Sequence, residues 1–223
     1  MDKSNVSRFK SISKVLESFI ARFPFVIVPT KYGIFVTPPA SPKAQMLGTY
    51  ELTVSKIIKS SLGTDDVFVD VGAHAGYYTL MCAKLAKEVV AFEPNPTNYR
   101  FLILNILING LKNVVAIKAA VSDFDGYGEL NIPISKGKPL TSQGSLVHGG
   151  GKTINVPVVT LDKIFDSLDL NQPFHLLIKI DVEGAELNVI KGAIKTLNKG
   201  VKLVIIETHN TYTKNSIVEL LKT

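Results

Sequence analysis

Acidic residues stand at, or just after, the ends of five short apolar segments of this chain. If these segments are parallel strands, their carboxyl ends meet at one edge of a sheet, which is where ligands bind in open α/β folds. A basic chain, with a net charge of +6, that gathers carboxylates at this edge is suited to a cationic ligand. The five residues are Asp70, Glu93, Asp123, Asp181 and Glu207.

The first of these segments runs directly into a glycine-containing turn, Asp70-Val-Gly72-Ala-His-Ala-Gly76. Glycine lets the backbone approach a ligand closely, and the helix expected after Gly76 offers free N–H groups. Glu93 follows Gly72 by about 20 residues, the spacing at which a carboxylate accepts hydrogen bonds from the ribose of a nucleotide cofactor. The alternative role for Glu93 is to cap the helix expected after Asn95-Pro96.

The position of Asp70 discriminates between nucleotide cofactors. A dinucleotide would place its pyrophosphate beside this carboxylate, where two like charges repel by about 4 kcal/mol at roughly 4 Å and an effective dielectric near 20. S-adenosylmethionine instead carries a sulfonium and an ammonium against a single carboxylate. The turn also lacks the full G-x-G-x-x-G pattern of dinucleotide sites. These residues favour S-adenosylmethionine over NAD.

Several segments resemble the FkbM-type methyltransferases, which are class I S-adenosylmethionine-dependent enzymes that mostly methylate hydroxyl groups of small molecules and glycans. The resemblance covers roughly residues 50–210, and its most specific part is Asp-Val-Glu-Gly-Ala-Glu together with Glu-Pro-Asn-Pro. The segments are FVDVGAHAGYYT, AFEPNPTNYRFLILNILING, AAVSD, VTLDKIF and IKIDVEGAELNVIKGA.

The resemblance implies a role for individual residues. Asp70, Gly72 and Gly76 would hold the methionine part of the cofactor, Glu93 would bind the ribose, and Asn98 would support Glu93. Ala120 and Val121 would flank the adenine, and Asp181 would lie near the amino group and the reacting methyl. Ala73, His74 and Pro94 complete the expected cofactor-binding set. His74 departs from the family, which usually has Asn at this position.

Methyl transfer to a hydroxyl needs alignment of the acceptor and removal of one proton, for which a general base contributes about 10²–10⁴ in rate. Asp181, Glu183 and His209 are the candidate bases. Glu183 and the nearby Glu186 have an alternative role as acids in the first turn of the following helix, and a lone His209 is also typical of a surface position. Asp181, Glu207 and His209 offer oxygen-rich ligands for Mg²⁺, but their spacing is not diagnostic, and we expect no metal.

An α/β fold with a doubly wound, mostly parallel sheet is expected to position these residues. Nearly continuous apolar strands are predicted at 67–71, 89–93, 113–121, 175–181 and 202–208. Helices are predicted at 77–87, from Pro96 to Gly110, at 184–198 and at 214–222.

Two further regions depart from this alternation. Residues 130–134 and 154–158 suggest an antiparallel pair that flanks a glycine-rich flap at 135–152. A second extended pair is predicted near the N-terminus, at 25–28 and 34–37. The class I sheet normally ends in an antiparallel hairpin, which we expect to be missing because the chain stops at Thr223. Strand 202–208 would then be an edge, covered by the pair 25–28 and 34–37, by a C-terminal hairpin beyond Thr223 or, as we favour, by a second subunit in a homodimer.

Composition agrees with one globular unit of 223 residues, with 46% hydrophobic and 20% charged residues. We divide it into a cap at 1–60 and a catalytic domain at 61–223. The single cysteine and the lack of a signal peptide or an apolar span predict a cytoplasmic chain. Lys and Arg are spread along the chain, so nucleic acid is not the expected partner, although an RNA methyltransferase and a non-catalytic cofactor-binding module remain alternatives.

Overall fold

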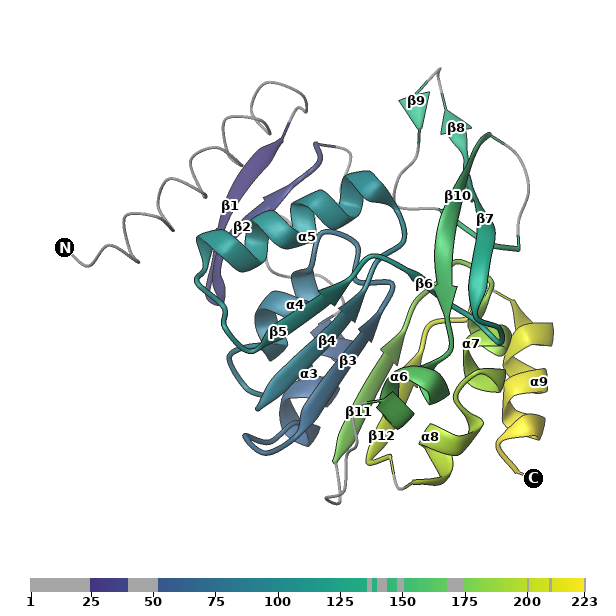
Figure 1. Ribbon diagram of the computed structural model, residues 1–223. Coiled ribbons are helices and arrows are strands. Elements are labelled where there is room, and N and C mark those ends of the chain that lie inside the picture. Colours follow the sequence, from purple (N-terminus) through teal and green to yellow (C-terminus); the bar gives the residue numbers. More distant parts are fainter. Residues whose placement is uncertain are drawn as a thin grey trace.

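The computed structural model describes residues 25–39, 52–135, 138–139, 144–147, 151–167, 175–199, 201–208 and 210–222. Strands and helices alternate along most of this length, as Figure 1 shows. The strands are β1 (Val26–Thr30), β2 (Gly33–Thr37), β3 (Val67–Val71), β4 (Glu88–Phe92), β5 (Val114–Ile117), β6 (Ala120–Val121), β7 (Gly126–Ile132), β8 (Ile134–Ser135), β9 (Lys138–Pro139), β10 (Lys152–Val159), β11 (Leu176–Ile180) and β12 (Leu203–Ile206). The helices are α3 (Leu52–Ser61), α4 (Tyr77–Cys82), α5 (Pro96–Ile108), α6 (Leu161–Ser167), α7 (Glu186–Lys191), α8 (Ile194–Asn198) and α9 (Thr211–Leu220).

The central sheet has five parallel strands in the order β12-β11-β3-β4-β5. All residues of β3 and β11 are buried, because apolar side chains leave both faces of these strands. Phe68 and Leu177 pack on one face with residues of α3, α4 and α5, whereas Val69 and Ile178 pack on the other with residues of α6, α7 and α9. This confirms the predicted doubly wound α/β fold.

The predicted strand 113–121 is wrong in its second half. It ends as β5 at Ile117, and the N–H of Ala119 turns back to donate to the carbonyl of Ile117 at 3.0 Å. Residues 120–121 leave the central sheet as β6 and pair in parallel with β10. β10 pairs antiparallel with β7, with Ile154 opposite Leu130, so the predicted antiparallel pair is confirmed. Half of the predicted flap at 135–152 lies outside the described residues.

Two predicted helices are shorter than expected. The helix predicted over 77–87 ends at Cys82, and the one predicted over 184–198 divides into α7 and α8. Gly192 is the C-cap of α7, and it lies so close to the carbonyl of Ser122 that a Cβ at this position would collide with it. α5 agrees with the prediction, since the side chain of Asn95 accepts a hydrogen bond from the N–H of Thr97 and Pro96 opens the helix.

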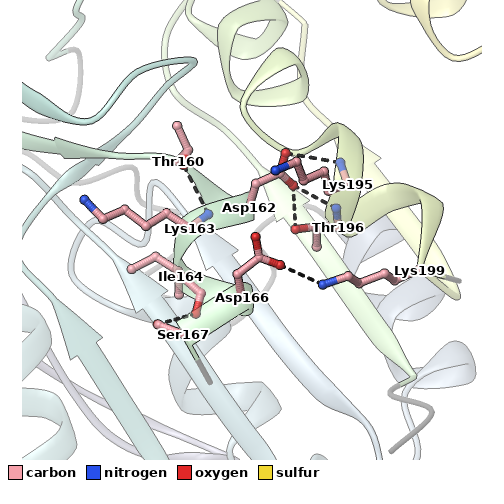
Figure 2. A network of polar contacts seen from close by, with 9 residues as sticks. All are labelled: Thr160, Asp162, Lys163, Ile164, Asp166, Ser167, Lys195, Thr196 and Lys199. Atoms are coloured by element: carbon pink, nitrogen blue, oxygen red, sulfur yellow. Dashed lines mark hydrogen bonds and ion pairs between the residues drawn. The ribbon is translucent and has the colours of Figure 1, made fainter. Parts of the chain in front are cut away.

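A polar network between α6 and α8 supports the new helix start after Gly192, as Figure 2 shows. The carboxylate of Asp162 accepts hydrogen bonds from the N–H groups of Lys195 (3.1 Å) and Thr196 (2.7 Å), and from the Thr196 hydroxyl at 2.8 Å. Asp162 thus satisfies N–H groups in the first turn of α8 that have no partner within the helix. A second contact, the ion pair between Lys199 and Asp166 at 2.7 Å, lies on the exposed side.

The predicted extended pair near the N-terminus is confirmed as the hairpin β1–β2. It lies along α5 (Figure 1) rather than along β12, so the alternative in which this pair covers the strand is wrong. Asn105 of α5 accepts from the N–H of Val36 at 2.7 Å and donates to its carbonyl at 2.8 Å, and it also donates to the carbonyl of Ala75 at 2.7 Å. One amide therefore connects the hairpin to the glycine turn.

Within the described residues, β12 forms one edge of the central sheet. The same part of the chain holds no helix with the length and apolar character needed to cross a membrane.

Candidate functional site

The glycine turn after β3 is shaped by two residues with left-handed backbone conformations. Gly72 has a φ of 82°, and a Cβ there would collide with the carbonyl of Asp181. Gly76 has a φ of 90° and leaves a Cβ no room beside Leu102. Larger residues would strain the turn and separate it from the end of β11. Gly72 therefore lets the turn after β3 lie against the end of β11, and Gly76 lets it lie against α5.

His74 lies within this turn and has a φ of 53°. Asn, Asp and His are the non-glycine residues most often found in this left-handed region. The replacement of the family's usual Asn by His therefore keeps the backbone conformation. Burial lowers the pKa of His74 to about 4, although Asp181 opposes this effect. The imidazole is therefore neutral at pH 7.

Glu93 follows β4 directly and is buried. Its carboxylate accepts hydrogen bonds from the N–H groups of His74 and Asn95, both at 2.8 Å, and from the side-chain amide of Asn98 at 3.4 Å. Burial raises the pKa of Glu93 to about 7 despite these three donors. Glu93 thus makes local contacts at the start of α5 and connects them to the glycine turn, while its contact with a ribose stays a prediction.

Asp70, in β3, is buried and carries an acceptor atom that has no partner. Its Oδ2 accepts from the hydroxyl of Thr79 at 2.6 Å, but its Oδ1 has no hydrogen bond within the described part of the chain. Burial raises the pKa of Asp70, and the charge of Lys179 and the hydroxyl of Thr79 oppose that rise. A buried carboxyl oxygen without a donor fits a ligand group that carries one, such as an ammonium, so these residues fit S-adenosylmethionine.

Asp181 begins the turn after β11 and is partly exposed, with a side-chain exposure of 21%. Its Oδ2 lies 3.1 Å from the Nζ of Lys179, whose side chain is only 5% exposed. The Lys179 Nζ also lies 5.0 Å from the ring centroid of Tyr78 in α4. Lys179 was not among the residues predicted from the sequence. A single lysine within the apolar strand LLIKI is unusual, and this feature could have identified it.

Glu183 lies in the same turn and has a φ of 55°, followed by Gly184 with a φ of 102°. The carbonyl of Glu183 accepts a hydrogen bond from the hydroxyl of Ser145 at 2.8 Å. Glu186 lies in the first turn of α7, in agreement with the alternative role given for it above. Its Oε1 accepts a hydrogen bond from the N–H of Gly184 at 2.7 Å. The residues that precede α7 are thus held from two sides.

The remaining predicted site residues are less directly placed. Ala120 and Val121 are buried in β6, in the second sheet rather than beside Glu93 in the central one. Ala73 is buried in the glycine turn, and Pro94 is half-buried after Glu93. His209 lies outside the described residues. Elsewhere, the described side chains include no group of three His, Cys, Asp or Glu residues that could hold a metal ion.

The chain matches one family of known proteins over most of its length. The family described as Methyltransferase FkbM domain matches residues 70–222, from Asp70 through both helices that follow Asp181 and on to α9. The hexuronic acid methyltransferase AglP of Haloferax volcanii is 28% identical over 171 residues, which are 77% of this chain and 67% of that protein.

Two solved structures are also similar to this chain. Methyltransferase FkbM from Methylobacillus flagellatus is 14% identical with a TM-score of 0.49, and the match covers 98% of this chain and 52% of that one. TYW2 from M. jannaschii, solved in complex with AdoMet, is 31% identical with a TM-score of 0.37, over 43% of each chain. This chain therefore spans two thirds of the length of AglP and about half, or less, of the two solved chains.

The family match includes both the glycine turn and the Asp-Val-Glu-Gly turn that the structure brings together. This chain belongs to the FkbM methyltransferases, and S-adenosylmethionine is its methyl donor.

Proposed function

We propose that this protein methylates a hydroxyl oxygen of a sugar, in a glycan or in a small molecule that contains one. The observation that carries the proposal is the similarity to a hexuronic acid methyltransferase, which extends over 77% of the chain. The chemistry of the site agrees, because a partly exposed carboxylate, Asp181, lies at the edge of the sheet where ligands bind in such folds.

In this proposal, Asp181 accepts the proton of the attacking hydroxyl. S-adenosylmethionine, when bound, supplies the electrophilic methyl group. Asp70 and Asp181 offer negative charge to the cationic cofactor, and the neutral His74 adds no opposing charge at pH 7. Glu183 and His209 stay alternative bases. The contacts of Ala120 and Val121 with an adenine also belong to this proposal.

A transfer assay with methyl-labelled S-adenosylmethionine tests the proposal. The acceptors are neutral sugars and glycans on one side, and uronic acids and uronate-containing glycans on the other. We expect labelled product with at least one sugar acceptor, and we expect the label to survive mild alkali because it is a methyl ether. Release of the label by alkali would show a methyl ester on a uronate carboxylate and would contradict the hydroxyl assignment.

The variant Asp181→Asn separates the two outcomes further. Transfer to a hydroxyl should lose about 10²–10⁴ in kcat when its base is removed. Transfer to a carboxylate needs no base, since that acceptor is already an anion. Asp65→Asn is the matched control, because Asp65 is an exposed aspartate before β3. Equal kcat values for the wild type and Asp181→Asn would remove Asp181 as the base.

Two alternatives make different predictions in the same assay. An RNA methyltransferase would label RNA rather than sugars, and its binding would weaken steeply with salt. A module without catalysis would bind S-adenosylhomocysteine and label none of the acceptors. The same proposal includes a division of the chain into a cap at 1–60 and a catalytic domain at 61–223. It also includes a homodimer formed over the β12 edge.

A further inference from the structure

Lys179 is the fourth of the five residues of β11. The other residues of β11 are apolar, and all five residues of this strand are buried. A lysine in such a place keeps its charge only where negative groups and a favourable ring surround the ammonium. Lys179 has both, since its Nζ lies 3.1 Å from Asp181 and 5.0 Å from the ring centroid of Tyr78.

Lys179 is also adjacent to Asp70. The two residues are directly paired between β11 and β3, so their side chains leave the sheet on the same face. Asp181 follows Lys179 by two residues, and the ammonium of Lys179 contacts Asp181 and interacts through its charge with Asp70. Its charge opposes the effect of burial on the pKa of Asp70.

The groups that face this cluster come from every element around it. Asp70 lies in β3, Asp181 after β11, His74 in the glycine turn, Glu93 after β4, Tyr78 and Cys82 in α4, and Lys59 in α3. The side chain of Ile205, paired with Lys179 on β12, adds no charge.

We propose that Lys179 is a positioning residue, whose ammonium is the fixed countercharge that holds Asp70 and Asp181 ready for a cationic cofactor. With both carboxylates ionised, Asp70, Lys179 and Asp181 together carry one net negative charge. S-adenosylmethionine carries one net positive charge, so the two are matched. Lys179 acts through the carboxylates, because its own side chain is almost fully enclosed.

The inference rests on the cofactor of the family and not on the proposed sugar acceptor. Its test is therefore a binding experiment, with S-adenosylmethionine itself as the probe and the full chain as the protein. Calorimetry between pH 6 and 9 compares the wild type with Lys179→Met, Lys179→Gln and Lys179→Arg. Lys191→Met, which removes an exposed lysine at the end of α7, is the matched control. Circular dichroism shows which variants are folded.

The measured quantity is the ratio of variant to wild-type affinity at each pH. Titration of the probe's own amine and of Glu93 occurs in both proteins and largely cancels in this ratio. Without the countercharge, Asp70, whose pKa burial already raises, should hold its proton up to a higher pH, since a neighbouring charge moves a pKa by about 1–3 units. For Lys179→Met and Lys179→Gln, the ratio of variant to wild-type affinity should therefore fall by about tenfold for each pH unit below the raised pKa of Asp70.

Lys179→Arg should restore the pH profile of the wild type, and Lys191→Met should not alter it. If Lys179→Met fails to fold, the comparison of Lys179→Gln with Lys179→Arg decides, because Gln keeps a hydrogen-bond donor without the charge. A ratio for Lys179→Gln that does not vary with pH would overturn the inference and leave Lys179 a packing residue. Failure of the wild type to bind the probe would instead contradict the cofactor, and failure to label any sugar would contradict only the proposed function.

Discussion

The buried carboxylate of Glu93 should make the stability of the empty protein depend on pH. Its pKa is about 7 in the folded chain, mainly because burial disfavours the ionised form, against an ordinary value of 4.5. Between these two values the folded chain binds a proton that the unfolded chain has already lost. The free energy of unfolding therefore decreases as pH rises through this window.

The size of the effect follows from the two pKa values. The gap between 4.5 and about 7 corresponds to about 3 kcal/mol, at about 1.36 kcal/mol for each pKa unit. About 2.5 kcal/mol of it falls between pH 5 and pH 8. Other groups also titrate in this range, so the decisive quantity is the difference between the wild type and Glu93→Gln, which cannot ionise.

Urea denaturation at pH 5 and pH 8 measures this difference. The wild type should lose about 2.5 kcal/mol more than Glu93→Gln between the two pH values. Glu88→Gln is the control, since Glu88 is an exposed glutamate at the start of β4 and should behave like the wild type. A loss in Glu93→Gln as large as that of the wild type would refute the argument that the buried carboxylate is its source.

Binding of S-adenosylhomocysteine should depend on pH in the opposite direction. The predicted ribose contact needs the ionised carboxylate as acceptor, so the affinity of the wild type should rise with pH up to a little above 7. Glu93→Gln should bind more weakly, and without this rise. Unchanged affinity of the variant, measured by calorimetry, would remove the ribose assignment.

Three further predictions concern the cofactor, the fold and the assembly. Asp70→Asn should weaken S-adenosylhomocysteine binding by about 1.5–3 kcal/mol in calorimetry, because the buried charged acceptor is lost; stronger binding of NADH by this variant would instead contradict the choice of cofactor. Asp162→Ala should lower the unfolding free energy by about 0.5–2 kcal/mol, because it uncaps α8, whereas Asp166→Ala removes only an exposed ion pair and should change the unfolding free energy by less than about 1 kcal/mol. Light scattering should show a homodimer at micromolar concentration, and a 24.3 kDa monomer at high concentration would leave the β12 edge uncovered by a second copy.

The sequence by itself determined the layered part of the fold and the edge at which function is found. Apolar runs such as 67–71 and 175–181 can be satisfied only where both faces of a strand are covered, and this requirement is local to each run. The start of α5 was equally predictable, because Asn95 and Pro96 act on their own neighbours. Since parallel strands end at one edge, the positions of Asp70, Glu93 and Asp181 in the chain were enough to place them near one another.

Only the tertiary structure decided how these residues interact. The predicted helix is interrupted at Gly192, where the carbonyl of Ser122, distant in the chain, leaves no space for a Cβ. Glu93 has a raised pKa because burial outweighs three hydrogen bonds, and no spacing in the sequence shows that balance. The sequence shows Lys179 only as a lysine within an apolar strand. The pairing of β11 with β3 is what places it beside Asp70. Contacts and desolvation depend on partners far away in the chain, and only the folded molecule brings them together.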